Sequence, residues 1–369
     1  MIFFIILYLE KDTSQSKFTI AFKYNKMKNL FITISLLFFS IASFSQVYPD
    51  KYYVQFTDKN NSPYSINAPE EYLSQRAIDR RQAQNIAIDI KDLPVNPQYL
   101  DGVSKTGAVI INPTKWLNGT TVYAADPSII AAIENLPYVQ GSVKSVVGQN
   151  INTLDKFFVD DPSANEQIIQ LADHKTASMM DYYGPAFEQI QQVNGIPLHD
   201  NGFKGKGIII GVLDSGFDNA DEMPVFDSMW DSGRMLGGYD FVEKSELSFS
   251  THFHGAGVLS IMAANLPGTM VGTAPHASYL LIRTEDAATE YIIEEYNWVS
   301  GAEFADSAGA DILTTSLGYS TFDDPSQNHT YEDLDGNTTP ITRGSDIAAS
   351  RGLAVMNSAG NSGQAAWYY

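Results

Sequence analysis

The sequence predicts an α/β protein whose larger part is a doubly wound parallel sheet, preceded by a small α+β domain. From residue 182 onward, apolar runs alternate with helical patterns, and the run at 208–213 is continuous, as in strands buried on both faces. Between residues 47 and 147, strand and helix patterns alternate on a smaller scale. The chain of 369 residues is long enough for both parts.

The composition excludes several classes of function. The chain contains 23 Lys+Arg and 43 Asp+Glu, a formal net charge of −20, and no cysteine. Nucleic acid is not expected as a partner, because phosphate contacts need clustered Lys and Arg. The missing cysteines exclude disulfides, thiolate nucleophiles and zinc sites built from cysteine.

The first 46 residues differ in charge from the rest of the chain. They carry five Lys and two acidic residues, net +3, which leaves 18 basic and 41 acidic residues, net −23, on residues 47–369. Residues 27–46 combine Lys28 with an apolar run too short for a membrane anchor, which predicts a secretory signal peptide and a secreted protein. Residues 1–26 are then expected to lie upstream of the true start.

The small domain is expected at residues 47–147, followed by a polar linker at 148–181. Its pattern is strand, helix, strand, helix, strand. The predicted strands are 52–56, 107–111 and 139–147, and the predicted helices are 69–84 and 127–134.

The parallel sheet is expected within residues 182–369. Its helices are predicted to stop at Gly309 and Gly352, which suit the left-handed conformation after a helix. The predicted strands are 208–213, 278–282, 311–315 and 353–358, and the predicted helices are 254–265, 291–308 and 341–350. The carboxyl ends of parallel strands meet at one edge of the sheet, where ligands usually bind.

Polar residues follow these strands in a pattern that suits acyl transfer. Asp214 follows the first strand, His254 opens a helix of small residues, and Asn361 follows the last strand. A buried carboxylate can orient an imidazole, the imidazole can take a proton from a nucleophile, and an amide N–H can stabilise an oxyanion.

Several segments resemble motifs of the subtilases, the subtilisin-like serine endopeptidases. They lie at residues 183–190, 205–217, 254–264, 271–278, 315–318 and 358–363. The resemblance implies that Asp214 orients the general base His254 and that Asn361 donates to the oxyanion. It also implies that Ser316, Leu317 and Gly318 pair with the substrate backbone. Residues 50–147 resemble the inhibitory propeptide of the family, an intramolecular partner.

Two departures from the family pattern stand out. Gly257 occupies the position where the family usually has a second histidine, and no Gly-Thr-Ser-Met-Ala-Xaa-Pro-like segment with the nucleophilic serine occurs. We therefore expect residues 182–369 to be the N-terminal part of a catalytic domain that stops before the serine, and to be inactive as given. The expected substrates are proteins and peptides, and no cofactor is required.

Two other functions stay open at this stage. A subtilase-like extracellular binding protein could lack the serine, although such a protein would not need Asp214, His254 and Asn361 together. A metal-dependent hydrolase could use His252, His254 and Asp214, but no third histidine or acid lies at ligand spacing.

Calcium has no support from the sequence, and the metal content is left unknown. Residues 333–337 resemble part of a calcium loop, but Tyr331 stands where the loop needs a carboxylate.

Overall fold

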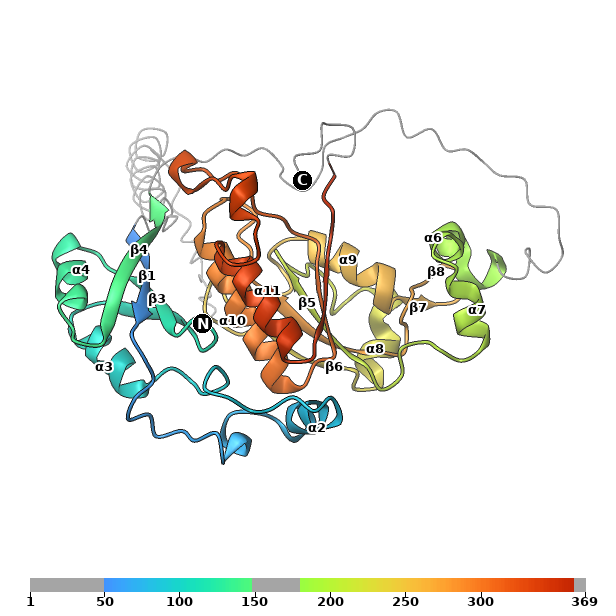
Figure 1. Ribbon diagram of the computed structural model, residues 1–369. Coiled ribbons are helices and arrows are strands. Elements are labelled where there is room, and N and C mark those ends of the chain that lie inside the picture. Colours follow the sequence, from blue (N-terminus) through green and yellow to red (C-terminus); the bar gives the residue numbers. More distant parts are fainter. Residues whose placement is uncertain (1–49, 148–179, 362–369) are drawn as a thin grey trace, which may run out of the picture. The chain divides into compact units, whose positions relative to one another are not determined.

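The computed structural model describes residues 50–147 and 180–361 (Figure 1). We call residues 50–147 the N-terminal region and residues 180–361 the main body. The predicted signal peptide, the residues before it and most of the predicted linker lie outside the described residues. Within these two ranges, no helix is long and apolar enough to cross a membrane.

The N-terminal region is built on a four-stranded antiparallel sheet in the order β2-β3-β1-β4. Two helices pack with it around Val54, Phe56, Val122 and Ile133, which are buried. The strands are β1 (Asp50–Phe56), β2 (Val109–Thr114), β3 (Gly119–Tyr123) and β4 (Val139–Val147), and the helices are α3 (Pro97–Lys105) and α4 (Pro127–Glu134). The predicted α+β character is confirmed, but β3 and α3 were not predicted.

The prediction of one helix over residues 69–84 is wrong. The chain forms a 3-10 helix, η1 (Pro69–Glu71), and then a separate helix, α2 (Gln75–Ala83). The hydroxyl of Ser74 accepts a hydrogen bond from the backbone N–H of Ala77 and caps the start of α2. A serine in this role has extended backbone geometry, so the helical pattern on its two sides cannot be continuous.

The main body is built on a five-stranded sheet in the order β11-β10-β5-β9-β6, with every neighbouring pair parallel. The strands are β5 (Ile209–Asp214), β6 (Met235–Asp240), β9 (Ser278–Arg283), β10 (Ile312–Thr315) and β11 (Ala354–Asn357). Strand β5, the first of the five along the chain, lies in the middle of the sheet, and later strands lie on both sides of it. This order confirms the predicted doubly wound parallel sheet.

Helices cover both faces of this sheet. Along β5, Ile209 and Leu213 pack into a core that includes residues of α10 and α11, whereas Ile210 and Val212 pack into a core that includes residues of α9. The three helices are α9 (His254–Ala263), α10 (Ile293–Ala308) and α11 (Pro340–Ser350). This alternation along one strand explains the continuous apolar run of the sequence.

Shorter elements complete the main body. They are α6 (Phe187–Gln192), α7 (Gly195–Asp200), α8 (Asp227–Asp231), the short hairpin β7 (Asn265–Leu266) and β8 (Met270–Val271), and the 3-10 helices η2 (Gly184–Ala186), η3 (Pro224–Phe226), η4 (Pro325–Gln327) and η5 (Tyr331–Asp333).

Helix α10 is buried on two sides, between the parallel sheet and the N-terminal region. On the sheet side, Gly301 allows close contact, because a Cβ there would lie 2.9 Å from Ile282 Cγ2. On the other side, the rings of Tyr53 and Tyr296 stack with centroids 4.1 Å apart. Glu303 accepts hydrogen bonds from the backbone N–H groups of Lys115 at 2.8 Å and Trp116 at 2.9 Å.

A second buried acid of α10 anchors α2. Asp306 is fully buried, and its carboxylate receives two hydrogen bonds from Arg81, at 2.8 and 2.9 Å, and one from Arg80. Arg81 also donates to Asp92 at 2.9 Å, and Arg351, which follows α11, donates to Asp92 at 3.2 Å. Charges buried this deeply are tolerated only when they are paired, so the contacts hold the N-terminal region in one position on the main body.

The burial of Glu303 makes the stability of the chain depend on pH. Burial raises the pKa of this carboxyl to about 7, with Lys115 and the two backbone N–H groups opposing the shift. In the unfolded chain the same group ionises near its ordinary pKa of 4.5. Between these two values the folded chain keeps a proton that the unfolded chain has lost, so this contribution to stability falls as pH rises and then levels off.

We therefore predict that Glu303→Gln removes this pH-dependent contribution to stability, because glutamine does not titrate. The free energy of unfolding of the unsubstituted chain, relative to the variant, should fall by up to about 3 kcal/mol from about pH 4.5 to about pH 7. Urea unfolding of both chains at several pH values measures the difference. A difference that stays constant or grows over this range would contradict the burial of an ionisable Glu303.

Candidate active site

The structure brings Asp214 and His254 into direct contact. Asp214 is the last residue of β5, and His254 is the first residue of α9. The Nδ1 atom of His254 lies 2.7 Å from Oδ1 of Asp214. The Asp214 side chain is fully buried, and that of His254 is 13% exposed. An ionised carboxylate only accepts hydrogen bonds, so Nδ1 carries the proton and Nε2 is left as the basic nitrogen of the neutral ring.

Two glycines allow this contact. A Cβ on Gly255 would lie 2.4 Å from the backbone oxygen of Gly216 and 2.8 Å from Cβ of Asp214. A Cβ on Gly216 would lie 2.5 Å from the backbone N of His252. Real Cβ atoms do not approach other atoms so closely, so α9 can begin beside the end of β5 only because both positions lack side chains.

Two polar residues from different segments lie beside Asp214: Ser215 directly follows β5, and His252 lies just before α9. Ser215 directs its backbone N–H to Asp214 Oδ1 at 2.7 Å, and its Oγ lies 3.2 Å from the same oxygen. The Oγ atom also lies 2.7 Å from Nδ1 of His252. His252 was considered only as a metal ligand, because nothing in its spacing indicates a contact with Ser215.

The loop after β5 is held from the neighbouring strand. Arg283, the last residue of β9, donates from Nε to the backbone oxygen of Ser215 at 2.9 Å and from its guanidinium to Asp240 at 2.9 Å. Arg283 and Asp240 are both buried. A paired guanidinium therefore fixes the backbone that positions the carboxylate.

The predicted substrate-binding residues lie beside Asp214. Strand β10 ends at Thr315, whose register partner in β5 is Leu213, so Ser316 and Asp214 follow paired residues. Leu317 is buried, whereas Gly318 is exposed. The predicted oxyanion donor, Asn361, is exposed and follows β11, the strand next to β10. The adjacent strands β10 and β11 are thus followed by four of the predicted residues, namely Ser316, Leu317, Gly318 and Asn361. The contact of Asp214 with His254 lies at the same edge of the sheet.

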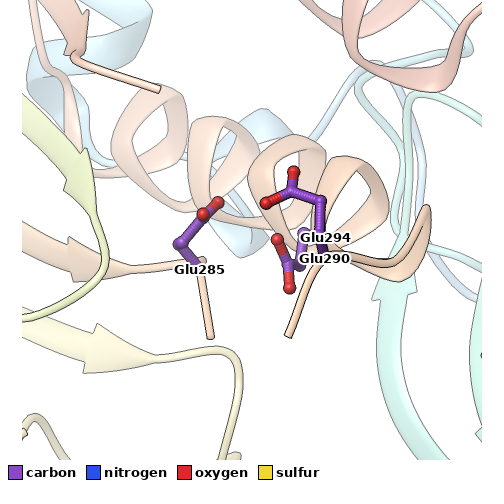
Figure 2. Close-up of side chains that lie close together, drawn as sticks. All are labelled: Glu285, Glu290 and Glu294. Atoms are coloured by element: carbon purple, nitrogen blue, oxygen red, sulfur yellow. The ribbon is translucent and has the colours of Figure 1, made fainter. Parts of the chain in front are cut away.

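Three carboxylates form a separate cluster, two from the segment after β9 and one from the first turn of α10 (Figure 2). One oxygen each of Glu285, Glu290 and Glu294 lies within 4.8 Å of the others, and Glu285 and Glu294 are buried. Tyr319 donates its hydroxyl hydrogen to Glu285, and burial raises the pKa of this tyrosine well above its ordinary value. Calcium takes six to eight oxygen ligands, and three carboxylates can supply at most six of them.

In the acidic loop at residues 333–337, the carboxylates accept hydrogen bonds from nearby backbone N–H groups. Asp335 Oδ1 accepts hydrogen bonds from the N–H groups of Asn337 at 2.7 Å and Thr338 at 2.8 Å. These bonds lower the pKa of Asp335. Asp333 closes a capping box with Thr330, so both acids have local structural roles.

Two regions of the chain match known families. Residues 51–160 match the Peptidase S8 propeptide domain of Bacteroidota, and residues 205–369 match the subtilase family. Among curated proteins, the chain is 27% identical over 177 residues to subtilisin E of Bacillus subtilis (strain 168), which covers 47% of this chain and 39% of the relative. It is 30% identical over 179 residues to the minor extracellular protease Vpr of the same organism, which covers 46% of this chain and 19% of the relative. The chain thus spans well under half the length of these relatives.

Among solved structures, the chain is similar to fervidolysin from Fervidobacterium pennivorans, a keratinolytic enzyme related to subtilisin. The identity is 17%, the coverage is 85% of this chain and 40% of that chain, and the TM-score is 0.46.

The contact of α9 with β5 can be tested by replacing glycines. Gly255→Ala should lower the free energy of unfolding by about 1–3 kcal/mol, because the new Cβ overlaps Gly216 and Asp214. Gly257→Ala is the matched control on the same helix: a Cβ there has no neighbour within 4 Å among the described residues, so alanine should stabilise the helix by about 0.5–1 kcal/mol. Urea unfolding of both variants measures the effects. Equal stability of the two variants would refute the tight contact.

Proposed function

Because the chain belongs to the subtilase family and carries a propeptide domain of the same peptidase group, we propose that the whole protein is a secreted serine endopeptidase. Its substrates are proteins and peptides, whose backbone bonds it hydrolyses. The observation that carries the proposal is the 2.7 Å contact between Asp214 and His254 at the carboxyl edge of the parallel sheet. This is the arrangement of an oriented general base.

The proposal gives each residue a role. Nε2 of His254 takes the proton from a serine hydroxyl while the serine oxygen attacks the carbonyl carbon of the substrate. His254 then gives this proton to the leaving amine as the C–N bond breaks, and water releases the acyl group by the same route. Asp214 keeps the imidazole in the required tautomer and stabilises the imidazolium. Asn361 donates its amide N–H to the oxygen that becomes negative.

In this proposal, the whole protein supplies the nucleophilic serine from outside these 369 residues. The family's Gly-Thr-Ser motif does not occur in these 369 residues, so the chain as given carries the acid and the base without the nucleophile. It is then inactive in peptide hydrolysis, because the three residues act as a unit.

The substrate backbone lies along residues 316–318. This segment directly continues β10 past the point where Thr315 pairs with Leu213, so its position beside Asp214 is fixed by the sheet register. Gly318 is exposed and has no side chain to hinder an added strand. An extended peptide can therefore add to this edge through backbone hydrogen bonds.

The N-terminal region acts as the intramolecular propeptide. Its contacts with α10 are buried and involve paired charges, as expected of an inhibitor that assists folding and stays bound until it is removed. Cleavage is proposed within residues 148–181. Export rests on the signal-peptide pattern at 27–46, and the extracellular protease Vpr is a relative that acts in the same compartment.

The test uses the product of the complete gene and a fluorophosphonate probe, which labels activated serines. The unsubstituted protein should be labelled, and His254→Ala should lose labelling, since loss of the base costs roughly 10⁶-fold in kcat in subtilisin. His276→Ala is the control, because His276 is an exposed histidine of the loop before β9. An unsubstituted protein that folds but is not labelled would favour the non-catalytic binding protein, and undiminished labelling of His254→Ala would refute the assigned base.

A further inference from the structure

Four polar groups form a continuous hydrogen-bonded chain that extends beyond the acid and the base. His254 Nδ1 contacts Asp214 Oδ1 at 2.7 Å, Ser215 Oγ lies 3.2 Å from that oxygen, and His252 Nδ1 lies 2.7 Å from Ser215 Oγ. Asp214 and Ser215 are fully buried. The second imidazole is therefore connected to the carboxylate that orients the first.

The connection depends on a single proton. A serine hydroxyl has one hydrogen, so Ser215 can donate either to Asp214 or to His252. If Nδ1 of His252 lacks a proton, the hydroxyl donates to this nitrogen, and Asp214 Oδ1 keeps the N–H groups of Ser215 and His254 as donors. If Nδ1 carries a proton, it donates to Ser215, and the hydroxyl becomes a third donor to Asp214 Oδ1.

This difference matters because the other carboxylate oxygen cannot compensate for it. Within the described residues, Asp214 Oδ2 is buried and has no hydrogen-bond partner. Each donor to Oδ1 stabilises the negative charge of Asp214 and weakens its hold on the His254 proton.

We propose that His252 is a positioning residue for the Asp214–His254 pair and acts on it through the Ser215 hydroxyl. The inference extends the proposed function, because it assigns a residue that tunes the general base. The rings of His252 and His254 have centroids 6.4 Å apart, so the route through Ser215 and Asp214 is the hydrogen-bonded one.

The backbone around His252 holds its ring in this position. Its backbone oxygen accepts a hydrogen bond from the N–H of Asp218 at 3.0 Å, and Gly216 leaves room for its backbone N. The ring of Phe253 lies 4.7 Å away, centroid to centroid. Asp214, Asp218 and His254 are the titratable residues of these neighbouring segments.

The test is a double-substitution cycle read by NMR on this chain with ¹⁵N-labelled histidine. The signal is the proton on Nδ1 of His254, whose chemical shift reports the strength of its hydrogen bond to Asp214. Ser215→Ala and His252→Leu should each shift this resonance. His252→Leu should cause no further shift when Ser215 is already alanine, because the connecting hydroxyl is gone.

Matched variants separate this role from a general loss of structure. Ser215→Thr keeps a hydroxyl and should keep the resonance near its original position, and His276→Leu should leave it unchanged. Urea unfolding shows whether each variant is folded. If His252→Leu does not fold, Ser215→Ala provides the test instead. In Ser215→Ala, the ¹⁵N signal of His252 Nδ1 must then move as well as the His254 resonance.

Two results would overturn the proposal. One is an unchanged His254 resonance in folded His252→Leu; the other is an equal shift from His252→Leu with and without the Ser215 hydroxyl. The measurement needs no hydrolysis, so its outcome is independent of the proposed peptidase activity. In the complete enzyme, His252→Leu should lower kcat about tenfold, with KM little changed and the pH profile displaced.

Discussion

The burial of α10 on two sides is the constraint on which the rest of the structure depends. One side of this helix packs on the parallel sheet, and the other side presents Glu303 and Asp306 to the N-terminal region. Buried carboxylates are costly without donors, and the donors here come from Lys115, Trp116 and Arg81 of that region. The N-terminal region thus supplies the donors that allow these acids to be buried.

Close packing has a second effect at the edge of the sheet. Gly216 and Gly255 let the start of α9 touch the end of β5, and the buried pair of Arg283 with Asp240 fixes the intervening backbone. The position of His254 is therefore set by backbone contacts, and Asp214 needs only to orient its ring. In the proposed function, such a support keeps the geometry of the general base constant.

The sequence predicted the elements whose signals are local. Buried strands such as β5 gave continuous apolar runs, and helix ends such as Gly309 gave their own stop signals. Strand β6 was missed because it contains two glycines and is only partly buried. The sequence offers no signal for the burial of Glu303 and Asp306 in α10, since their partners are about 190 to 230 residues away in the chain. The strand and helix ends indicated that Asp214 and His254 lie at one edge, whereas the contact of Ser215 with His252 depends on side-chain geometry that no sequence pattern reports.

The most direct test of this account is whether the N-terminal region stays bound when the chain is cut. A site for a specific protease, introduced between residues 148 and 179, would allow cleavage of the folded protein, followed by size-exclusion chromatography without denaturant. The two pieces should elute together in a 1:1 ratio, because the contacts of Tyr53, Glu303 and Asp306 do not need the linker. Elution of the N-terminal piece alone, with the main body still folded, would contradict an intramolecular propeptide held by buried contacts.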